Sequence, residues 1–277
     1  TGLYNPRIKE FTDLVRKAGG LNCYDQANAN ALFGITRAKE AGFDMCYFNL
    51  HKSFGTPHGC GGPGCGALGV IKELKEYLPK PLVGYDGEKY YLDNDLAHSI
   101  GKVKSFQGTP QVVLRAYAWT MTMGTEGLYE VSKIASLNNV YLYTKLLQHK
   151  GVTLPYDPKT QRIEQARYTM EATTKDTGIT CGDLARRVMD FGMHVWNSHH
   201  PFYIPEPLTL EPTESPTKED LDEYIATIHH ILDEAYENPD IIREAPHNSP
   251  THRTDESSVD DPNEWCPTWR VDQRKAK

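Results

Sequence analysis

The sequence predicts an α/β protein in which part of a large domain, with a parallel-type sheet, precedes a smaller C-terminal α+β domain. Two observations lead to this fold class. Residues 1–50 alternate between helical and strand-like patterns, which is typical of a parallel sheet. From residue 162 onward, a strand, a helix, a second strand and a second helix follow one another. We therefore expect a large-domain part over 1–105, connecting helices over 106–150, and a small domain with an irregular tail over 151–277.

The first helix is expected within residues 5–20, where two glycines end an amphipathic pattern. Its apolar face consists of Ile8, Phe11, Leu14 and Val15. The pattern resembles the middle of a βαβ unit whose first strand is missing, because the helix follows the first residues at once. Two strands are expected next, over 21–25 and 45–50. The second is apolar nearly throughout, as in a strand covered on both faces.

The connecting segment reads as helix in two pieces that are broken near Gly124. In the small domain we expect a strand over 162–172, a helix behind Thr180, and a strand over 207–213. The final helix runs from Thr217 to about Tyr236, and Thr217 with Asp220 resembles a capping box. Its apolar stripe consists of Leu221, Tyr224, Ile225, Ile228, Ile231, Leu232 and Ala235.

Composition narrows the class of protein. The 277 residues are 39% hydrophobic and 24% charged, which is enough apolar sequence for a real core. The net charge of −7 argues against a nucleic-acid-binding protein, which needs a basic face. No run approaches the ~20 apolar residues of a membrane helix. The six cysteines contain no CxxC pair, so we expect reduced thiols and a cytoplasmic protein, or a mitochondrial-matrix protein in a eukaryote.

The stretch YFNLHKSFGTPHGCGGPGCGALGV, residues 47–70, places Lys52 at the end of a predicted strand and before a glycine-rich loop. A phosphate-binding P-loop has the opposite order, with the lysine after the glycines, so we set that interpretation aside. A lysine that forms a Schiff base needs a fixed position and a neighbouring surface that admits a planar cofactor.

For pyridoxal phosphate, an acid must also face the pyridine nitrogen. Asp25 ends the neighbouring predicted strand, at the edge of the sheet where ligands collect. Ala27 is small enough to lie against a ring, and Asn28 and Asn30 are candidates to orient the acid or the ring substituents. The residues alone leave an alternative open, in which Asp25 caps a loop and Lys52 reaches solvent.

These residues resemble a known family. YDQANANA and FNLHKSFGTPHGCGGPGCGALGV are similar to motifs of the pyridoxal-phosphate subunit of glycine decarboxylase, the P-protein of the glycine cleavage system. The resemblance continues through VLRAYAW, GTEGLYEVS, IPEPLTLEPTES and REAPHNSPTHR, up to about Glu256. It implies the aspartate-aminotransferase type of fold, called fold type I, for which the cradle of the cofactor phosphate is expected before residue 1.

The resemblance also implies a set of site residues. Lys52 matches the Schiff-base lysine, Asp25 the acid on the pyridine nitrogen, and Ala27 the small residue against the ring. His51 matches the histidine beside the cofactor and is a catalytic candidate together with Lys52, whereas Asn28 and Ser53 are candidates for binding the cofactor.

The function that the resemblance implies is pyridoxal-phosphate-dependent decarboxylation of glycine, with transfer of the aminomethyl group to the lipoyl arm of the H-protein. The chain is then expected to work in a homo- or hetero-oligomer, with another chain supplying the rest of the cofactor site.

Departures from the family pattern keep one alternative open. Gln26 replaces a glycine, Cys60 and Cys65 interrupt the glycine-rich loop, and Glu164 falls where the family has a histidine, with Arg162 and Arg167 nearby. The stretch around Glu164 suggests a diverged enzyme that acts on another small amino acid. The part of the cofactor site expected before residue 1 suggests a second alternative, a non-catalytic subunit or fragment.

No metal site is expected. The histidines at 194, 199, 200, 229, 230, 247 and 252 lack a standard ligand spacing, and adjacent histidines on a helix point apart. We expect them to be solvated or hydrogen-bonded.

Overall fold

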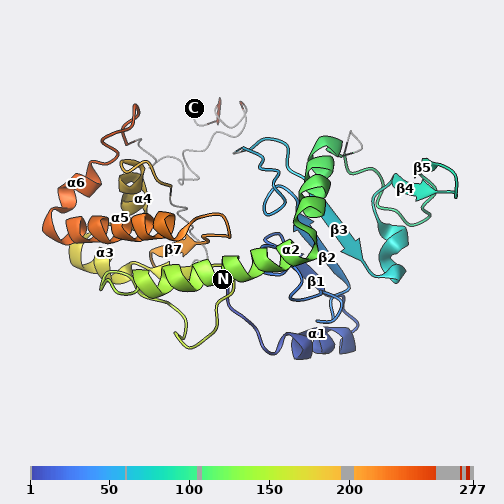
Figure 1. The fold of residues 1–277 in the computed structure, drawn as a ribbon, viewed down its shortest axis with the longest axis horizontal. Helices are drawn as coiled ribbons and strands as arrows, with labels where there is room; N and C mark the ends of the chain where they lie inside the picture. The colour runs from blue at the N-terminus through green and yellow to red at the C-terminus, as the bar shows by residue number, and fades with distance from the viewer. Residues whose placement is uncertain are drawn as a thin grey trace. The chain divides into compact units, whose positions relative to one another are not determined.

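The computed structural model describes residues 2–59, 61–104, 108–194, 203–253, 269 and 273–274. Figure 1 shows the order of the helices and strands. The chain divides into two compact units, which we call the first and the second unit. The first comprises Thr1–Tyr143, Tyr156–Ala166 and Glu211–Leu221, and the second Thr144–Pro155, Arg167–Leu210 and Asp222–Lys277. The division at residues 105 and 150 that the sequence suggested stays a prediction.

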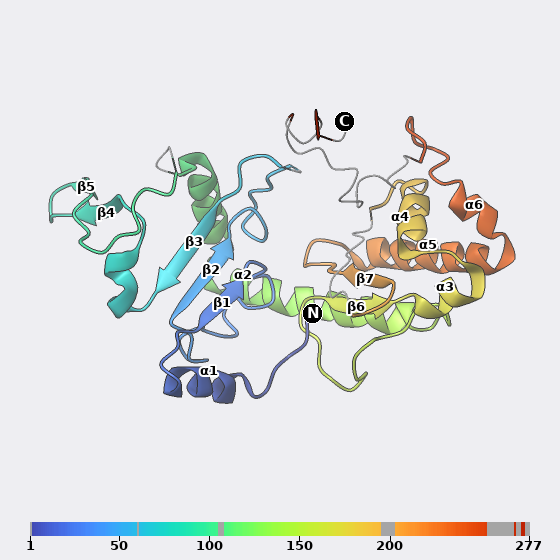
Figure 2. The same ribbon diagram turned by 180° about the vertical axis from the view of Figure 1, so that it is seen from behind.

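A three-stranded sheet organises the first unit. Strand β1 (Cys23–Gln26) pairs in parallel with β2 (Met45–Asn49), as the sequence predicted. Strand β3 (Gly66–Val70) pairs antiparallel with β2, so the glycine-rich loop is the connection of a β2–β3 hairpin. Figure 2 shows the three strands side by side. The expectation that residues 45–50 are covered on both faces is wrong for the described chain, because every residue of β2 is half-buried.

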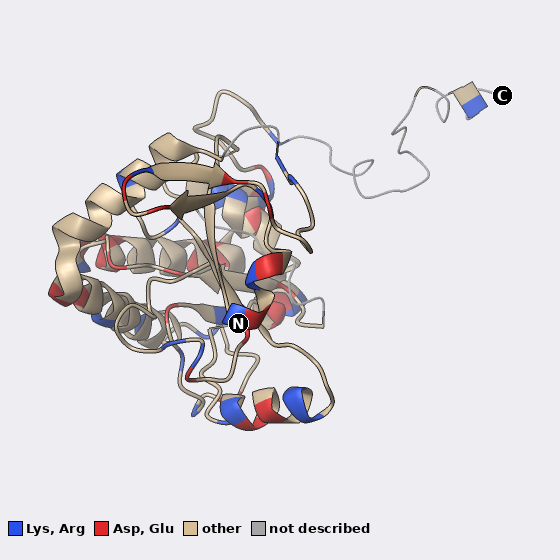
Figure 3. Cartoon of the chain, turned by 90° about the vertical axis from the view of Figure 1, so that its right-hand side faces the viewer, with Lys and Arg blue, Asp and Glu red and all other residues tan. Residues whose placement is uncertain are grey.

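Helix α1 (Ile8–Lys17) precedes the sheet and is held to it by polar groups. Thr12 Oγ1 donates to the carbonyl of Ala41, and Arg16 forms a 3.1 Å ion pair with Asp44. Acidic and basic residues are interleaved along this helix, at the bottom of Figure 3. The predicted apolar face is not buried as a whole, since Phe11 and Leu14 are 57% and 65% exposed.

After β3 the chain forms elements that the sequence did not predict. A 3₁₀ helix, η1 (Lys72–Tyr77), leads to a hairpin of β4 (Leu82–Tyr85) and β5 (Tyr90–Asp93). The carboxylate of Asp86 accepts hydrogen bonds from the backbone of Glu88 and Lys89 and closes the turn. Such a side-chain-to-backbone turn carries no hydrophobic period, so the periodicity of the sequence does not indicate it.

Helix α2 (Pro110–Leu146) contains the predicted break. Gly124 has φ 61° and ψ −175°, outside the helical region, and divides α2 into two pieces. Glycine reaches this conformation without the strain that a Cβ atom causes. None of the described helices combines the length with the apolarity that crossing a membrane requires.

The second unit contains most of the buried core. Strands β6 (Ala166–Thr169) and β7 (Pro207–Leu210) form a two-stranded sheet. Helices α3 (Glu171–Thr177), α4 (Cys181–Met189), α5 (Lys218–Glu237) and α6 (Pro239–Arg243) complete the described elements of this region. The predicted stripe of α5 is confirmed, since Ile228, Ile231 and Leu232 are fully buried.

Both predicted helix starts are confirmed. Thr180 and Asp183 form a capping box at α4, and Thr217 and Asp220 form one at α5. The predicted strand over 162–172 is wrong at both ends, because only Ala166–Thr169 is strand and α3 begins at Glu171. Gly178, in a left-handed conformation (φ 75°), ends α3.

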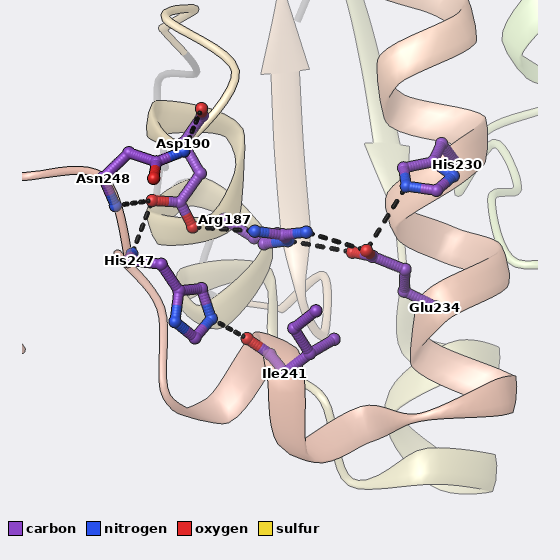
Figure 4. Close-up of polar contacts among 7 residues, drawn as sticks. All are labelled: Arg187, Asp190, His230, Glu234, Ile241, His247 and Asn248. Carbon is purple, nitrogen blue, oxygen red and sulfur yellow. Dashed lines mark hydrogen bonds and ion pairs between the residues drawn. The ribbon is translucent and has the colours of Figure 1, made fainter.

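An ion-pair network fixes the segment after α6 within the second unit (Figure 4). The guanidinium of Arg187 donates to both carboxylate oxygens of Glu234, at 2.9 and 2.8 Å, and to Asp190 at 3.0 Å. The other oxygen of Asp190 accepts the backbone N–H groups of His247 and Asn248. Burial opposes ionisation of Asp190, but the hydrogen bonds from Asn248, Arg187 and His247 outweigh it and lower its pKa.

Candidate active site

The candidate site lies in the first unit, at the edge where β1 and β2 end. Because the two strands are parallel, their carboxyl ends meet at one edge, where α/β proteins collect ligands. Asp25 is paired with Tyr47 in the sheet, and the turn that carries Lys52 begins directly after β2. The structure therefore brings Asp25 and the lysine turn to the same edge, as the sequence predicted.

Asp25 is exposed and lies on the same part of the sheet as Tyr47. One carboxylate oxygen accepts the backbone N–H of Ala27 at 3.0 Å, which fixes the start of the small-residue stretch after β1. A hydrogen bond from the phenol of Tyr47 to Asp25 raises the pKa of Tyr47, because ionised tyrosine has no proton to donate.

Lys52 is exposed, and its amine donates a hydrogen bond to Oδ1 of Asn28 at 2.6 Å. Two hydrogen bonds to backbone carbonyls hold the turn that carries Lys52. The backbone N–H of Lys52 donates to the carbonyl of Asn49, and the Thr56 hydroxyl donates to the carbonyl of Leu50. Ser53 follows in the same turn and is half-buried.

A cluster of aromatic rings supports the lysine turn. Phe54, which comes two residues after Lys52, packs against Phe33, Phe48 and Trp119, with ring centroids 5.2, 6.3 and 5.8 Å away. Edge-to-face rings at these separations attract one another. No local sequence pattern reveals this cluster, because its members come from three distant segments.

His51 faces the glycine-rich loop. Its Nδ1 lies 3.1 Å from both the backbone nitrogen and the carbonyl oxygen of Cys65, so that it accepts from the first in one tautomer and donates to the second in the other. A Cβ atom at Gly64 would lie 3.1 Å from the same Nδ1, so that the loop approaches the ring closely because it lacks a side chain there. His58 packs edge-on against His51, with centroids 4.9 Å apart. Cys60, in the same loop, lies outside the described residues.

A second polar group reaches Asn28 from far along the chain. Glu211 accepts a hydrogen bond from Asn28 Nδ2 at 2.5 Å on Oε2, and one from Asn30 Nδ2 at 3.2 Å on Oε1. The amide of Asn28 therefore connects Lys52 to Glu211. Glu211 belongs to a motif of the family resemblance, but the sequence alone suggested no role for it. The signal that could have found it is an acid directly after strand β7 (Pro207–Leu210).

Burial raises the pKa of Glu211 to about 7, and the charges of Glu164 and Glu214 act in the same direction. The hydrogen bond from Asn30 and the charge of Lys52 oppose this rise. Glu164, where the family resemblance places a histidine, is thus electrostatically coupled to the candidate site. The Arg162 guanidinium donates to several backbone carbonyls, including Thr160 at 2.6 Å, and it orders its own loop.

Histidines outside this site form ordinary polar contacts. His230 pairs with Glu234 at 3.3 Å, and His229 lies 3.3 Å from the carbonyl oxygen of Leu146. Among the described residues, no group of three or more His, Cys, Asp or Glu side chains could hold a metal ion. His199 and His200 lie outside the described residues.

The residues present fit a pyridoxal phosphate ring in their chemistry. An exposed amine and a carboxylate come from the ends of adjacent parallel strands. Oδ1 of Asn30, five residues after Asp25, is buried and has no hydrogen-bond partner among the described residues. This oxygen is therefore free to accept a hydrogen bond from a bound molecule. An amine and a carboxylate are the groups that bond an aldehyde and face a ring nitrogen in pyridoxal-phosphate chemistry.

Solved structures define the class of fold. The crystal structure of glycine decarboxylase (P-protein) of the glycine cleavage system matches with a TM-score of 0.67 and 20% identity, over 81% of this chain and 51% of that chain. A cysteine desulfurase from Thermococcus onnurineus matches with a TM-score of 0.59 and 15% identity, over 84% and 57%. The fold is thus a mixed α/β fold similar to those of fold type I pyridoxal-phosphate enzymes, as the sequence analysis expected.

Sequence comparison makes the relationship specific. Residues 131–249 match the family model of the glycine dehydrogenase C-terminal domain. "Probable glycine dehydrogenase (decarboxylating) subunit 2" of Thermococcus gammatolerans is 46% identical over 257 residues, covering 92% of this chain and 51% of the relative. The same subunit of Caldanaerobacter subterraneus is 44% identical over 256 residues, covering 92% and 52%. The chain is a homologue of glycine dehydrogenase (decarboxylating) subunit 2, and it spans about half the length of the curated relatives it matches.

Proposed function

We propose that the protein takes part in pyridoxal-phosphate-dependent decarboxylation of glycine, with Lys52 as the residue that bonds the cofactor. The observation that supports this most directly is the position of the Lys52 amine, 2.6 Å from Asn28 Oδ1 at the edge of the sheet where Asp25 also ends. The homology to glycine dehydrogenase subunit 2 makes glycine the first substrate to test.

Each site residue has a distinct task in this proposal. The Lys52 amine binds the cofactor aldehyde, and the Asp25 carboxylate keeps a proton on the pyridine nitrogen. Ala27 leaves room for the ring, while Asn28 orients the lysine amine. His51 and Ser53 lie beside this amine in sequence and are proposed to contact the cofactor. When bound, pyridoxal phosphate supplies an electron sink for the charge that decarboxylation leaves behind.

The proposed acceptor of the aminomethyl group is the lipoyl arm of an H-protein, within an oligomer. The position of Lys52 is consistent with such a partner. Its amine is exposed, so that the lipoyl arm of another protein can approach it.

Borohydride trapping tests the proposed function. The full chain is incubated with pyridoxal phosphate and reduced, and the labelled peptide is identified by mass spectrometry. We expect one label per chain on Lys52, and no label in Lys52→Arg, which keeps the charge but cannot form the imine. Label spread evenly over exposed lysines, or unchanged in Lys52→Arg, would contradict the proposal. Absence of any label on the wild-type chain would instead favour the non-catalytic alternative.

A second candidate is a diverged enzyme that acts on another small amino acid. It is favoured by Glu164, whose charge acts on Glu211 beside the proposed site. Exchange of labelled bicarbonate into glycine, in the presence of a lipoyl H-protein, separates the two. Exchange with glycine supports the first candidate, whereas exchange confined to another amino acid in a panel supports the second.

A further inference from the structure

The amide of Asn28 has one orientation that satisfies both of its neighbours. Nδ2 donates to Glu211 at 2.5 Å, and Oδ1 accepts from the Lys52 amine at 2.6 Å. An ionised carboxylate only accepts hydrogen bonds, and an ammonium group only donates them. Turning the amide over would set oxygen against the carboxylate and NH₂ against the ammonium, and both contacts would be repulsive.

Glu211 is itself held in place for this contact. Its second oxygen accepts from Nδ2 of Asn30, a residue that is 2% exposed, so both carboxylate oxygens are occupied by amide donors. Asn28, Asn30, Lys52 and Glu211 all belong to the first unit. The chain of contacts therefore runs from an anchored acid to an exposed amine within one compact unit.

We propose that Glu211 is a positioning residue for Lys52, which acts by fixing the side-chain amide of Asn28 with its oxygen toward the lysine amine. This contact keeps the amine in place. The catalytic meaning of the arrangement rests on the proposed function, whereas the arrangement itself does not require a cofactor.

The proposal predicts a dependence on pH. Once Glu211 is protonated, its hydroxyl can donate to Asn28, so that Glu211 no longer favours one orientation of the amide and only the Lys52 ammonium still does. The charged groups that act on Glu211 are Glu164 and Glu214, which favour protonation, and Lys52, which opposes it. Positioning is thus complete at alkaline pH and is lost in acid.

Competitive acetylation of the full chain without cofactor tests this proposal. The rate at Lys52 is measured by mass spectrometry against the other lysines of the same sample. Glu211→Gln has nearly the same shape, but its own amide can donate or accept, so it no longer dictates the orientation of Asn28. We expect Lys52 to react about three- to tenfold faster in Glu211→Gln at pH 8, the fold-change that corresponds to weakening of a typical intramolecular hydrogen bond. The difference should vanish near pH 6.

Two further variants separate positioning from a general loss of structure. Glu164→Gln removes a neighbouring charge without touching Asn28, and its Lys52 should react as in the wild type at pH 8. Asn28→Ala should raise the rate as Glu211→Gln does, and the double variant should add nothing, because Glu211 acts through Asn28.

Three results would overturn the proposal: an unchanged rate in Glu211→Gln, additive effects in the double variant, or equal acceleration of all lysines. If Asn28→Ala does not fold, the comparison of Glu211→Gln with Glu164→Gln still decides. A failure of borohydride trapping on Lys52 would reject the proposed function and leave this measurement intact.

Discussion

Gly55 lies against the indole ring of Trp119: a Cβ atom at position 55 would come within 3.0 Å of Cδ1 of this tryptophan. The residue also has a φ of +67°, which favours glycine over residues with a side chain. The lysine turn thus packs tightly onto the aromatic cluster, three residues beyond Lys52.

The first prediction concerns this contact. Gly55→Ala should lower the free energy of unfolding by about 2–3 kcal/mol, because backbone strain and a clash with Trp119 add together. Urea unfolding followed by tryptophan fluorescence measures it. Gly59→Ala is the matched control, since Gly59 has a φ of +61° but open space around it. It should cost only about 1 kcal/mol, and equal losses in the two variants would show that the ring contact is unimportant.

The second prediction concerns Glu211 and the pH dependence of stability. Its pKa is about 7 in the folded chain against an ordinary value of 4.5, so the unfolded chain loses this proton first as pH rises. The stability that this group contributes is fully present below pH 4.5 and is lost as pH rises through about 7. Gln does not titrate, so the unfolding free energy of Glu211→Gln should rise by about 2 kcal/mol relative to that of the wild type as pH increases between these values. This figure is already reduced because Glu211 is partly exposed to solvent.

Urea unfolding at a series of pH values checks the Glu211 prediction. Glu164→Gln serves as the comparison, because removing the neighbouring charge should move the transition to lower pH without abolishing it. Parallel pH profiles for the wild type and Glu211→Gln would mean that Glu211 is ionised normally in the folded chain.

The third prediction concerns the network in the second unit. Asp190→Asn removes the charge that faces Arg187 and weakens the contacts to the backbone of His247 and Asn248. The side chain of Asp190 is only 1% exposed, so the expected loss is about 3 kcal/mol of unfolding free energy. In the same experiment, Asp240→Asn at an exposed ion pair with Arg243 should cost less than ~1 kcal/mol.

The pH dependence of this network has the opposite sign to that of Glu211. Because the pKa of Asp190 is lowered in the folded chain, its contribution is present above the ordinary value of 3.8 and is lost as pH falls through the folded value. The Asp190→Asn variant should therefore approach the wild type in stability in strong acid. A constant difference down to the lowest pH would show that the charge is not the cause.

The fourth prediction concerns the start of α4. Thr180→Ala removes the side-chain oxygen that accepts the backbone N–H of Asp183, and it should cost about 1 kcal/mol in thermal or urea unfolding. Thr180→Ser keeps the hydroxyl and should retain most of the stability. Equal losses in both variants would point to the methyl group rather than to the cap.

The local sequence determined much of what the structure contains. The capping boxes at Thr180 and Thr217, the break at Gly124 and the buried stripe of α5 depend on residues within a few turns of one another. Helix periodicity and cap chemistry act over that range, so they can be read without knowing the fold. The strand predicted over 162–172 was wrong, since the pattern did not show that helix α3 begins at Glu171.

The candidate site also has a part that the sequence predicted and a part that only the tertiary structure decided. The sequence by itself brought Asp25 and Lys52 to one edge, because parallel strands in succession end at the same side of a sheet. Only the tertiary structure decided that Glu211, 183 residues after Asn28, bonds the amide that also bonds Lys52. It also decided that β3 returns antiparallel to β2 and that Phe11 and Leu14 stay exposed. The physical reason is that a hydrogen bond or a buried contact depends on where segments meet in space, and no local period of the sequence records that distance.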